Sequence, residues 1–173
     1  MKFAISLVQT RFESPLGPLI VAATDKGLAG LWFDGQRHLP SELTGVAVWP
    51  TDDDHPVLKH AVKQLEEYFD GTRNTFDLPL DLSHGTTFQQ SVWQALLAIA
   101  PGSTASYGEI SARIGNPAAV RAVGAAVGRN PVSIIVPCHR VMGADGSLTG
   151  YAGGLDRKTA LLTLEGVLEE TIL

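Results

Sequence analysis

Short apolar runs separated by turn residues open the chain. Leu19 to Thr24 and Leu28 to Phe33 are apolar runs joined by Asp25-Lys26-Gly27, which has the turn chemistry of a β-hairpin. Ser14-Pro15-Leu16-Gly17 is a further turn just before the first run. This pattern predicts a small antiparallel sheet.

A helical period follows the predicted hairpin. Between Pro56 and Phe69 the apolar residues recur at helical spacing, and Gly71 ends the pattern. Phe76 to Leu82 alternates well enough to predict another strand. We therefore expect residues 1–84 to form an α/β domain with a small sheet and one helix.

The second half of the chain has a mostly helical period. One helix follows Thr86-Thr87 and ends at Pro101-Gly102. Tyr107 to Ile114 forms a second, short helix, and Gly115-Asn116 makes a turn. Pro117 then opens a third helix, with Asn116 as its cap. Two short helices across a glycine-containing turn outline a helix-turn-helix.

Alanine and glycine dominate the third predicted helix, and Arg121 is its one long basic side chain. Close packing against another element is one interpretation of such small residues. The other is that a narrow helix approaches the walls of a minor groove, which is about 6 Å wide against about 10–12 Å for an ordinary helix. Arg121 would then project as a probe.

The composition indicates a globular protein. Of the 173 residues, 45% are apolar and 18% are charged, which suits one domain with a buried core or two small ones. No apolar run approaches the roughly 18 residues that a membrane span needs. We expect a soluble, cytoplasmic protein with no membrane partner.

Charge is distributed unevenly along the chain. The net charge of -5 argues against a polyanionic partner for the chain as a whole. Residues 1–84 hold seven basic and twelve acidic side chains, whereas residues 85–173 hold six of each. Residues 105–141 hold four arginines against Glu109 alone. A local basic surface is one interpretation, and scattered solvated arginines are the other.

Cys138 is the only cysteine, which excludes disulfides within the chain and a cysteine-built zinc site. Ser133 to Val136 predicts a buried strand that stops at Pro137, so that Cys138 lies at the end of an element. His139 and Arg140 bring positive charge, which favours a thiolate. An inert core cysteine is the alternative, because free cysteine behaves as a small hydrophobe.

Six short motifs follow one another around this cysteine. They are Tyr107-Gly108, Gly115-Asn116-Pro117, Arg121-Ala122-Val123-Gly124, Asn130-Pro131, Pro137-Cys138-His139-Arg140-Val141 and Gly150-Tyr151-Ala152-Gly153-Gly154. Their order and spacing, from Phe88 to about Glu165, resemble the O6-alkylguanine-DNA alkyltransferase family in its bacterial single-polypeptide form. The residues from Ser14 to Trp32 also resemble the amino-terminal part of the bacterial members.

The resemblance implies a fold. It is a ribonuclease-H-like α/β domain over residues 1–84, followed over residues 85–173 by a mostly helical alkyltransferase domain with a winged-helix-like helix-turn-helix. The resemblance also implies a reaction, in which an alkyl group passes irreversibly from O6 of guanine, and from O4 of thymine as a further substrate, to Cys138. The substrate is double-stranded or single-stranded DNA, and the damaged nucleotide is flipped out through the minor groove. No cofactor and no metal are implied, and we expect a monomer, with cooperative binding along DNA left open.

The roles of individual residues carry over from the family motifs. Cys138 matches the nucleophile, Tyr107 the tyrosine that assists rotation of the base, and Arg121 the arginine that takes its place in the stack. His139, Glu165 and Asn130 match residues that activate and hold the thiol through a water molecule and a braced turn. The remaining matches are Asn116, Gly108 and Arg129 at the DNA-binding surface, and Val141, Tyr151, Ala152, Gly153 and Val127 in the guanine pocket.

General chemistry agrees with these roles. A duplex hides the alkyl carbon on O6, so the nucleotide has to be extruded at a cost of a few kcal/mol. Attack at a saturated carbon suits a soft thiolate, and a phenol such as Tyr107 can protonate the departing guanine. Glu165, near the end of a helix from about Asp156, would orient His139. From the residues alone, a solvated helix end is the better interpretation of Glu165.

The chain departs from the family pattern at a few positions. Ala152 stands where some members have serine, and Val127 where some have methionine, which leaves the tolerance of bulky alkyl groups open. The zinc-binding cysteines of vertebrate members are absent. Three other functions stay open: a cysteine hydrolase using Cys138 and His139, a non-enzymatic DNA-binding protein that senses alkyl lesions, and a helix-turn-helix regulator. Lesion-sensing relatives carry another residue at the cysteine position, and adjacent residues of a strand are poor geometry for a catalytic dyad.

Overall fold

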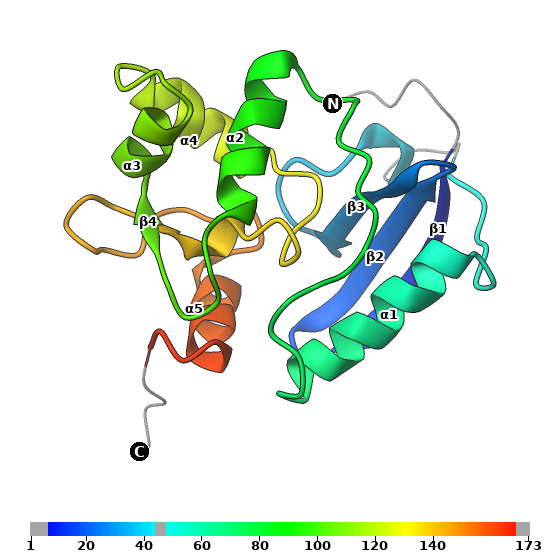
Figure 1. Ribbon diagram of the computed structural model, residues 1–173. Helices are drawn as coiled ribbons and strands as arrows, with labels where there is room; N and C mark the ends of the chain where they lie inside the picture. Colours follow the sequence, from blue (N-terminus) through cyan, green and yellow to red (C-terminus); the bar gives the residue numbers. More distant parts are fainter. Residues whose placement is uncertain (1–6, 44–47, 169–173) are drawn as a thin grey trace.

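A small sheet with one helix lies beside a group of four helices in the computed structural model, which describes residues 7–43 and 48–168 (Figure 1). The sheet has the order β1-β2-β3, and both pairs are antiparallel. Its strands are β1 (Val8–Ser14), β2 (Gly17–Thr24) and β3 (Gly27–Phe33). The predicted sheet and its two turns are confirmed, whereas β1 is a strand that the apolar pattern did not predict.

Both faces of the sheet are buried. On one face Leu19 and Val21 of β2 share a core with Leu58 and Leu65 of α1 (Pro56–Phe69), the predicted helix. Burial on both faces explains why β2 and β3 are continuous apolar runs instead of alternating ones. The second face is covered by the loop beyond β3, which includes the short helix η1 (Ser41–Leu43). The buried residues of this face are Leu7, Ile20, Ala22, Ala29, Trp32 and Trp49.

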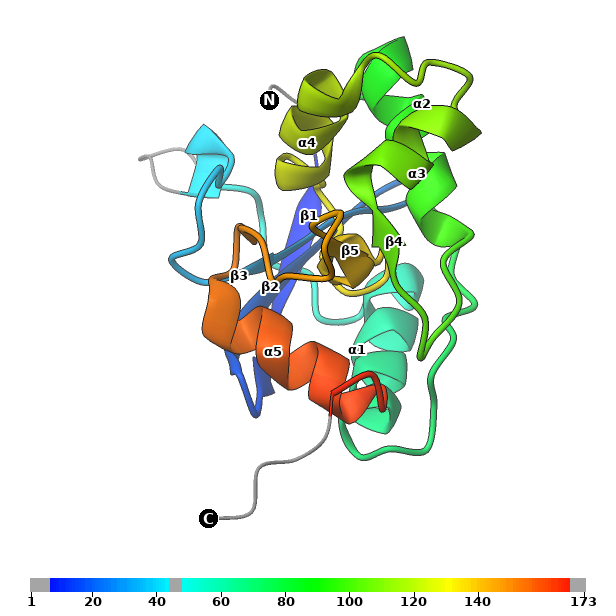
Figure 2. The same ribbon diagram turned by 90° about the vertical axis from the view of Figure 1, so that its left-hand side faces the viewer.

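The second part of the chain is mostly helical, as predicted. Two of its helices begin with capping boxes, in which Thr86 and Ser106 accept from the backbone N–H three residues on. In Figure 2 the last helix passes in front of the sheet towards α1. In chain order the elements are α2 (Thr87–Leu97), β4 (Ala105–Ser106), α3 (Tyr107–Arg113), α4 (Val120–Gly128), η2 (Cys138–Arg140), β5 (Val141–Met142) and α5 (Leu155–Leu164).

The strand predicted over Phe76 to Leu82 is wrong. Within it only Leu80 pairs, as an isolated bridge to Leu28. Pro79 has no N–H to donate, and the segment meets only the start of β3. It makes two backbone hydrogen bonds there, from Leu28 N to Pro79 O and from Asp81 N to Leu28 O, both 2.8 Å.

The start predicted for the third helix is also wrong. Asn116 donates its N–H to Ser111 O at 3.0 Å, which closes the end of α3, and its own carbonyl accepts from Ala119 in a separate turn. Pro117 therefore lies in that turn, and α4 begins at Val120 with Ala119 as its N-cap. The first helix of this part is also shorter than predicted, since α2 ends at Leu97, ahead of Pro101.

The buried strand predicted over Ser133 to Val136 is a tight turn instead. The side chain of Asn130 donates to Val136 O at 2.7 Å and accepts from Val132 N at 3.0 Å, which gives the backbone an alternative to a strand ladder. Ile134 adopts a φ of 72°, an unfavourable value for a β-branched residue. Apolar composition predicted burial correctly and backbone conformation incorrectly.

This turn joins the two parts of the molecule. Leu31 of β3 donates to Pro131 O at 2.8 Å, and its own carbonyl accepts from Ser133 N at 3.0 Å. The free edge of the sheet thereby fixes the segment that leads directly to Cys138.

Candidate active site

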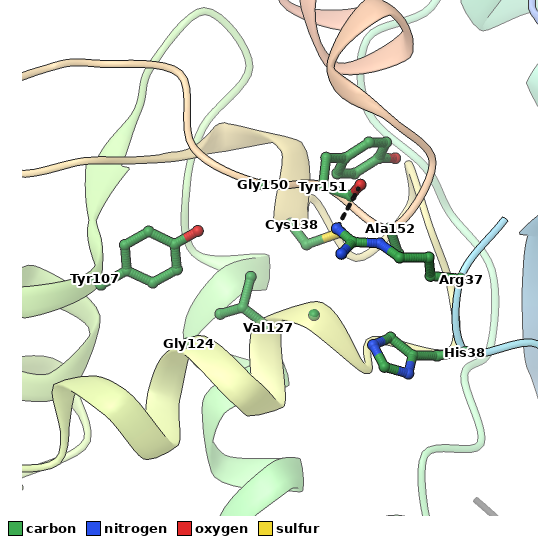
Figure 3. A pocket seen from close by; sticks show the side chains of 10 residues that line it. Arg37, His38, Tyr107, Gly124, Val127, Cys138, Gly150, Tyr151 and Ala152 are labelled. Atoms are coloured by element: carbon green, nitrogen blue, oxygen red, sulfur yellow. Dashed lines mark hydrogen bonds between the residues drawn. The ribbon is translucent and has the colours of Figure 1, made fainter.

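Cys138 opens η2 directly after Pro137, at the floor of a cavity of about 190 Å³ (Figure 3). The cysteine is buried, with 6% of its surface exposed, so the cavity is its route to solvent. Burial raises the pKa of its thiol to about 11, while Asn130 and the charge of Lys158 act in the lowering direction. The remaining lining residues are Arg37, His38, Tyr107, Gly124, Val127, Gly128, Gly150, Tyr151 and Ala152.

Of the five residues predicted for the guanine pocket, three line this cavity: Val127, Tyr151 and Ala152. Val141 directly follows η2 and is fully buried outside the cavity lining. Gly153 lies beneath the Tyr151 ring, where a Cβ would be 2.7 Å from Tyr151 and 2.9 Å from Phe33. Glycine is therefore required at position 153 for the close packing that holds Tyr151 in the wall.

Glu165 is the C-cap of α5, and its carboxylate is almost completely buried, with 1% of the side chain exposed. His139 Nε2 lies 2.8 Å from Oε2, and Arg140 donates to both oxygens, at 2.7 and 3.0 Å. Tyr68 of α1 donates its hydroxyl to Oε2 at 2.6 Å. The solvated helix end is therefore the wrong interpretation of Glu165.

These contacts set the ionisation of the group. Burial acts to raise the pKa of Glu165, but hydrogen bonds from His139, Arg140 and Tyr68 outweigh it and lower the pKa to about 2. An ionised carboxylate can only accept, so Nε2 of His139 carries the proton and Nδ1 keeps its lone pair. Nδ1 is buried and has no hydrogen-bond partner among the described residues. It is thus an available proton acceptor one residue from the thiol.

Arg140 does not serve as the predicted charge beside the thiol. Its guanidinium is paired with Glu165 and also donates to Ile99 O at 2.6 Å. Among the charges that act on the Cys138 thiol, the cation is Lys158 of α5. The expectation failed because a basic side chain next to the cysteine in sequence points to a carboxylate 25 residues further on.

Tyr107 opens α3 and directs its hydroxyl towards the cavity (Figure 3). The hydroxyl lies 2.9 Å from Thr149 Oγ1 on the opposite loop. A Cβ on Gly124 of α4 would lie 3.9 Å from the Tyr107 ring, so the small residues of α4 bring this helix close to the tyrosine. The phenol therefore spans the entrance between α4 and the loop before Tyr151.

The residues predicted to bind DNA lie on α3, on α4 and in the turns next to them. Gly108, Asn116, Arg121 and Arg129 are all exposed. Arg121 is in the first turn of α4, next to exposed Ala122. Small neighbours leave this long side chain free to project.

The sequence interpretation missed residues that the first part of the chain contributes to the site. Arg37, in the loop after β3, donates its backbone N–H to Ala152 O at 3.1 Å and its side chain to Tyr151 O at 3.4 Å. His38, with a φ of 62°, lines the cavity beside it. Neither residue belongs to a sequence motif that indicates the site. Both are brought close to the cysteine by the fold.

Comparison with protein families matches both parts of the chain. Residues 7–82 match the model described as "6-O-methylguanine DNA methyltransferase, ribonuclease-like domain". Residues 87–167 match "6-O-methylguanine DNA methyltransferase, DNA binding domain". The chain belongs to the 6-O-methylguanine DNA methyltransferase family.

Individual relatives agree with this assignment. A methylated-DNA–protein-cysteine methyltransferase from Mycobacterium bovis is 52% identical over 153 residues, which are 88% of each chain. One of the same name from Methanosarcina acetivorans is 49% identical and covers 90% of this chain and 96% of its own. The chain is accordingly a DNA-binding methyltransferase of DNA repair, in which an alkyl group is transferred to a protein cysteine.

A solved structure of a family member extends the likeness to three dimensions. Mycobacterium tuberculosis OGT in complex with DNA is 48% identical and superposes with a TM-score of 0.79, covering 93% of this chain and 92% of that one. In the part of this methyltransferase that the structure describes, no helix is long and apolar enough to cross a membrane.

Proposed function

We propose that the protein removes an alkyl group from O6 of guanine in DNA, and from O4 of thymine as a further substrate, and retains it on Cys138. The observation that carries this proposal is the cysteine at the floor of a cavity, one residue from an imidazole whose other nitrogen is held by a buried carboxylate. A thiolate attacks the alkyl carbon, the O6–carbon bond breaks, and a thioether forms. Ordinary thiol exchange cannot cleave a thioether, and the chain has no second cysteine to attempt it, so each molecule acts once.

Activation of the thiol follows from the Glu165 contacts. In the proposal a water molecule carries the thiol proton from Cys138 to Nδ1 of His139. Glu165 stabilises the imidazolium that results, as a carboxylate does for a catalytic imidazole elsewhere. Asn130 contributes by bracing the turn before Pro137 through its bonds to Val132 and Val136. These three are positioning and proton-accepting groups around the nucleophile.

Protonation of the departing guanine is assigned to Tyr107. Guanine leaves with the electron pair of the broken bond, and a phenol at the entrance of the cavity can protonate it as the bond breaks. The base would be held by Val127, Tyr151, Ala152 and, from behind, Val141 and Gly153. Because Ala152 has no hydroxyl, only its backbone N–H can reach the alkylated oxygen.

Extrusion of the damaged nucleotide is assigned to α4. In this proposal α3 and α4 form a winged-helix-like helix-turn-helix, and α4 enters the minor groove, where its small residues permit close approach. Arg121 occupies the space of the flipped base, while Gly108, Asn116 and Arg129 contact the backbone. Residues 85–173 would thus hold the chemistry and residues 1–84 would support it. One molecule acts on each lesion, in double-stranded or single-stranded DNA.

Loss of the lesion from synthetic DNA tests this function. A duplex with one O6-methylguanine should lose its methyl group when mixed with wild-type protein and keep it with Cys138→Ser. If both proteins bind the duplex and neither demethylates it, the protein senses lesions without repairing them, and the proposal is wrong.

A further inference from the structure

Lys158 of α5 is a fully buried lysine with an unusual set of partners. Its ammonium donates to Val141 O at 2.6 Å and to Thr149 O at 3.1 Å. No carboxylate forms a salt bridge with it within the described ranges 7–43 and 48–168. An ammonium has three donors, so these two carbonyls leave one N–H over. A buried charge without an anion is costly, and such a residue calls for an explanation.

The two carbonyls belong to the two backbone segments that border the cavity. Val141 follows η2, which begins at Cys138, and α5 packs against η2. Thr149 precedes the cavity residues Gly150 and Tyr151, and its hydroxyl meets the hydroxyl of Tyr107 at 2.9 Å. Lys158 therefore holds together the segment that carries the cysteine and the segment that carries the opposite wall.

Lys158 is the cation whose charge acts on Cys138, and other cations close in sequence have partners of their own. Arg140 and His139 are both bound to Glu165, and Arg157 stacks on the Phe33 ring at 4.6 Å. The other ionisable groups that line the cavity are the Tyr107 and Tyr151 phenols, Arg37 and His38. Burial lowers the pKa of Lys158, and a negative charge on Cys138 raises it again.

We propose that Lys158 supplies the fixed positive charge that stabilises the Cys138 thiolate, while its two hydrogen bonds keep both walls of the cavity in place. This role deepens the proposed alkyl transfer and rests on it. Lys158 is a positioning residue, since it acts through the cysteine and the backbone and not on the substrate. Removing its charge makes the thiolate harder to form, because the charge of Lys158 acts to lower the pKa of the thiol.

The pH dependence of thiol alkylation by iodoacetamide tests the charge. Lys158→Met removes the charge and the hydrogen bonds, and Lys158→Gln removes the charge but keeps an amide that can donate to both carbonyls. We expect the midpoint of the pH–rate profile to rise by about one unit or more in both variants, which is a tenfold smaller thiolate fraction at neutral pH. Lys63→Met, an exposed lysine on α1, should keep the wild-type midpoint. If folded Lys158→Gln keeps the wild-type midpoint of the pH–rate profile, the proposal is overturned. Lys158 would then only hold two backbone segments together through its hydrogen bonds.

Wild-type protein alone supplies a second test that does not depend on folding of a variant. In protein labelled at the lysine Cε, one of the five lysines should be protected from solvent and remain an ammonium at about pH 8, where the thiolate must form. If that lysine is neutral at this pH, the proposal is wrong. Neither experiment uses DNA, so its failure is distinct from a failure of methyl transfer, which the wild type and Cys138→Ser test separately.

Discussion

Four hydrogen-bond donors surround the carboxylate of Glu165, and they come from three residues, Tyr68, His139 and Arg140. These residues lie between 25 and 97 positions away in the sequence. No local pattern could reveal this arrangement, which is why a solvated helix end was the better expectation for an acidic residue at the end of α5. The importance of Cys138 was predictable, because its motif is local. The same reasoning failed for Arg140, and it found neither Lys158 nor Arg37.

Replacing Glu165 by glutamine should lower the free energy of unfolding of the protein by an amount that depends on pH. The folded pKa of Glu165 is lowered from 4.5 to about 2, so its contribution to stability is full above pH 4.5 and is lost as the pH falls towards 2. That contribution is about 3 kcal/mol at neutral pH. Urea unfolding at several pH values should show a difference in unfolding free energy between wild type and Glu165→Gln at pH 7 that narrows below pH 4.5 and is nearly gone at pH 2. Glu66→Gln, an exposed carboxylate on α1, is the control. A gap of constant size would contradict the assigned ionisation.

Among the secondary-structure elements, helices were predicted from the sequence more accurately than strands. Helical spacing predicted α1 with its observed bounds, because a buried stripe repeats along it. The bounds predicted for α3 and the start predicted for α5 differ from the observed ones by one residue. Apolar runs gave β2 and β3 correctly but also suggested strands over residues 76–82 and 133–136. The first is interrupted by Pro79, and the second is bent by the side chain of Asn130, so both are buried without pairing as strands. Burial was predictable in each case, and hydrogen bonding was not.

Arg121 gives a prediction about the role of α4 in extruding the damaged nucleotide. If the side chain fills the space of the flipped base, Arg121→Ala should slow repair of O6-methylguanine in duplex DNA at least about tenfold, a change of about 1.4 kcal/mol in the barrier. The reaction with free O6-benzylguanine needs no extrusion, so its rate should stay within about twofold of wild type. Arg11→Ala, an exposed arginine on β1 and outside α3, α4 and their turns, is the matched control. Equal losses on both substrates would show that Arg121 does not act in extrusion.

For the whole molecule, the distribution of charge limits how strongly DNA is held. The chain carries a net charge of -5, and the excess of acids lies entirely in residues 1–84, which hold twelve acidic and seven basic side chains. On α3, α4 and the turn after α4 the exposed arginines are Arg113, Arg121 and Arg129. Affinity should therefore be modest and independent of sequence. Phosphate contacts by about three cations predict a slope of about -3 in log K against log salt concentration. A slope near -8 in a titration of undamaged duplex would require a DNA-binding surface larger than α3, α4 and their turns.

The stoichiometry of transfer tests the central claim most directly. Wild-type protein is mixed with an excess of duplex DNA containing O6-methylguanine, and intact protein mass and peptide mapping are recorded at completion. We predict one methyl group per molecule, located on Cys138, with the remaining lesions untouched. Repair of many lesions by each molecule, or a protein whose mass does not change while the DNA is bound, would contradict the account.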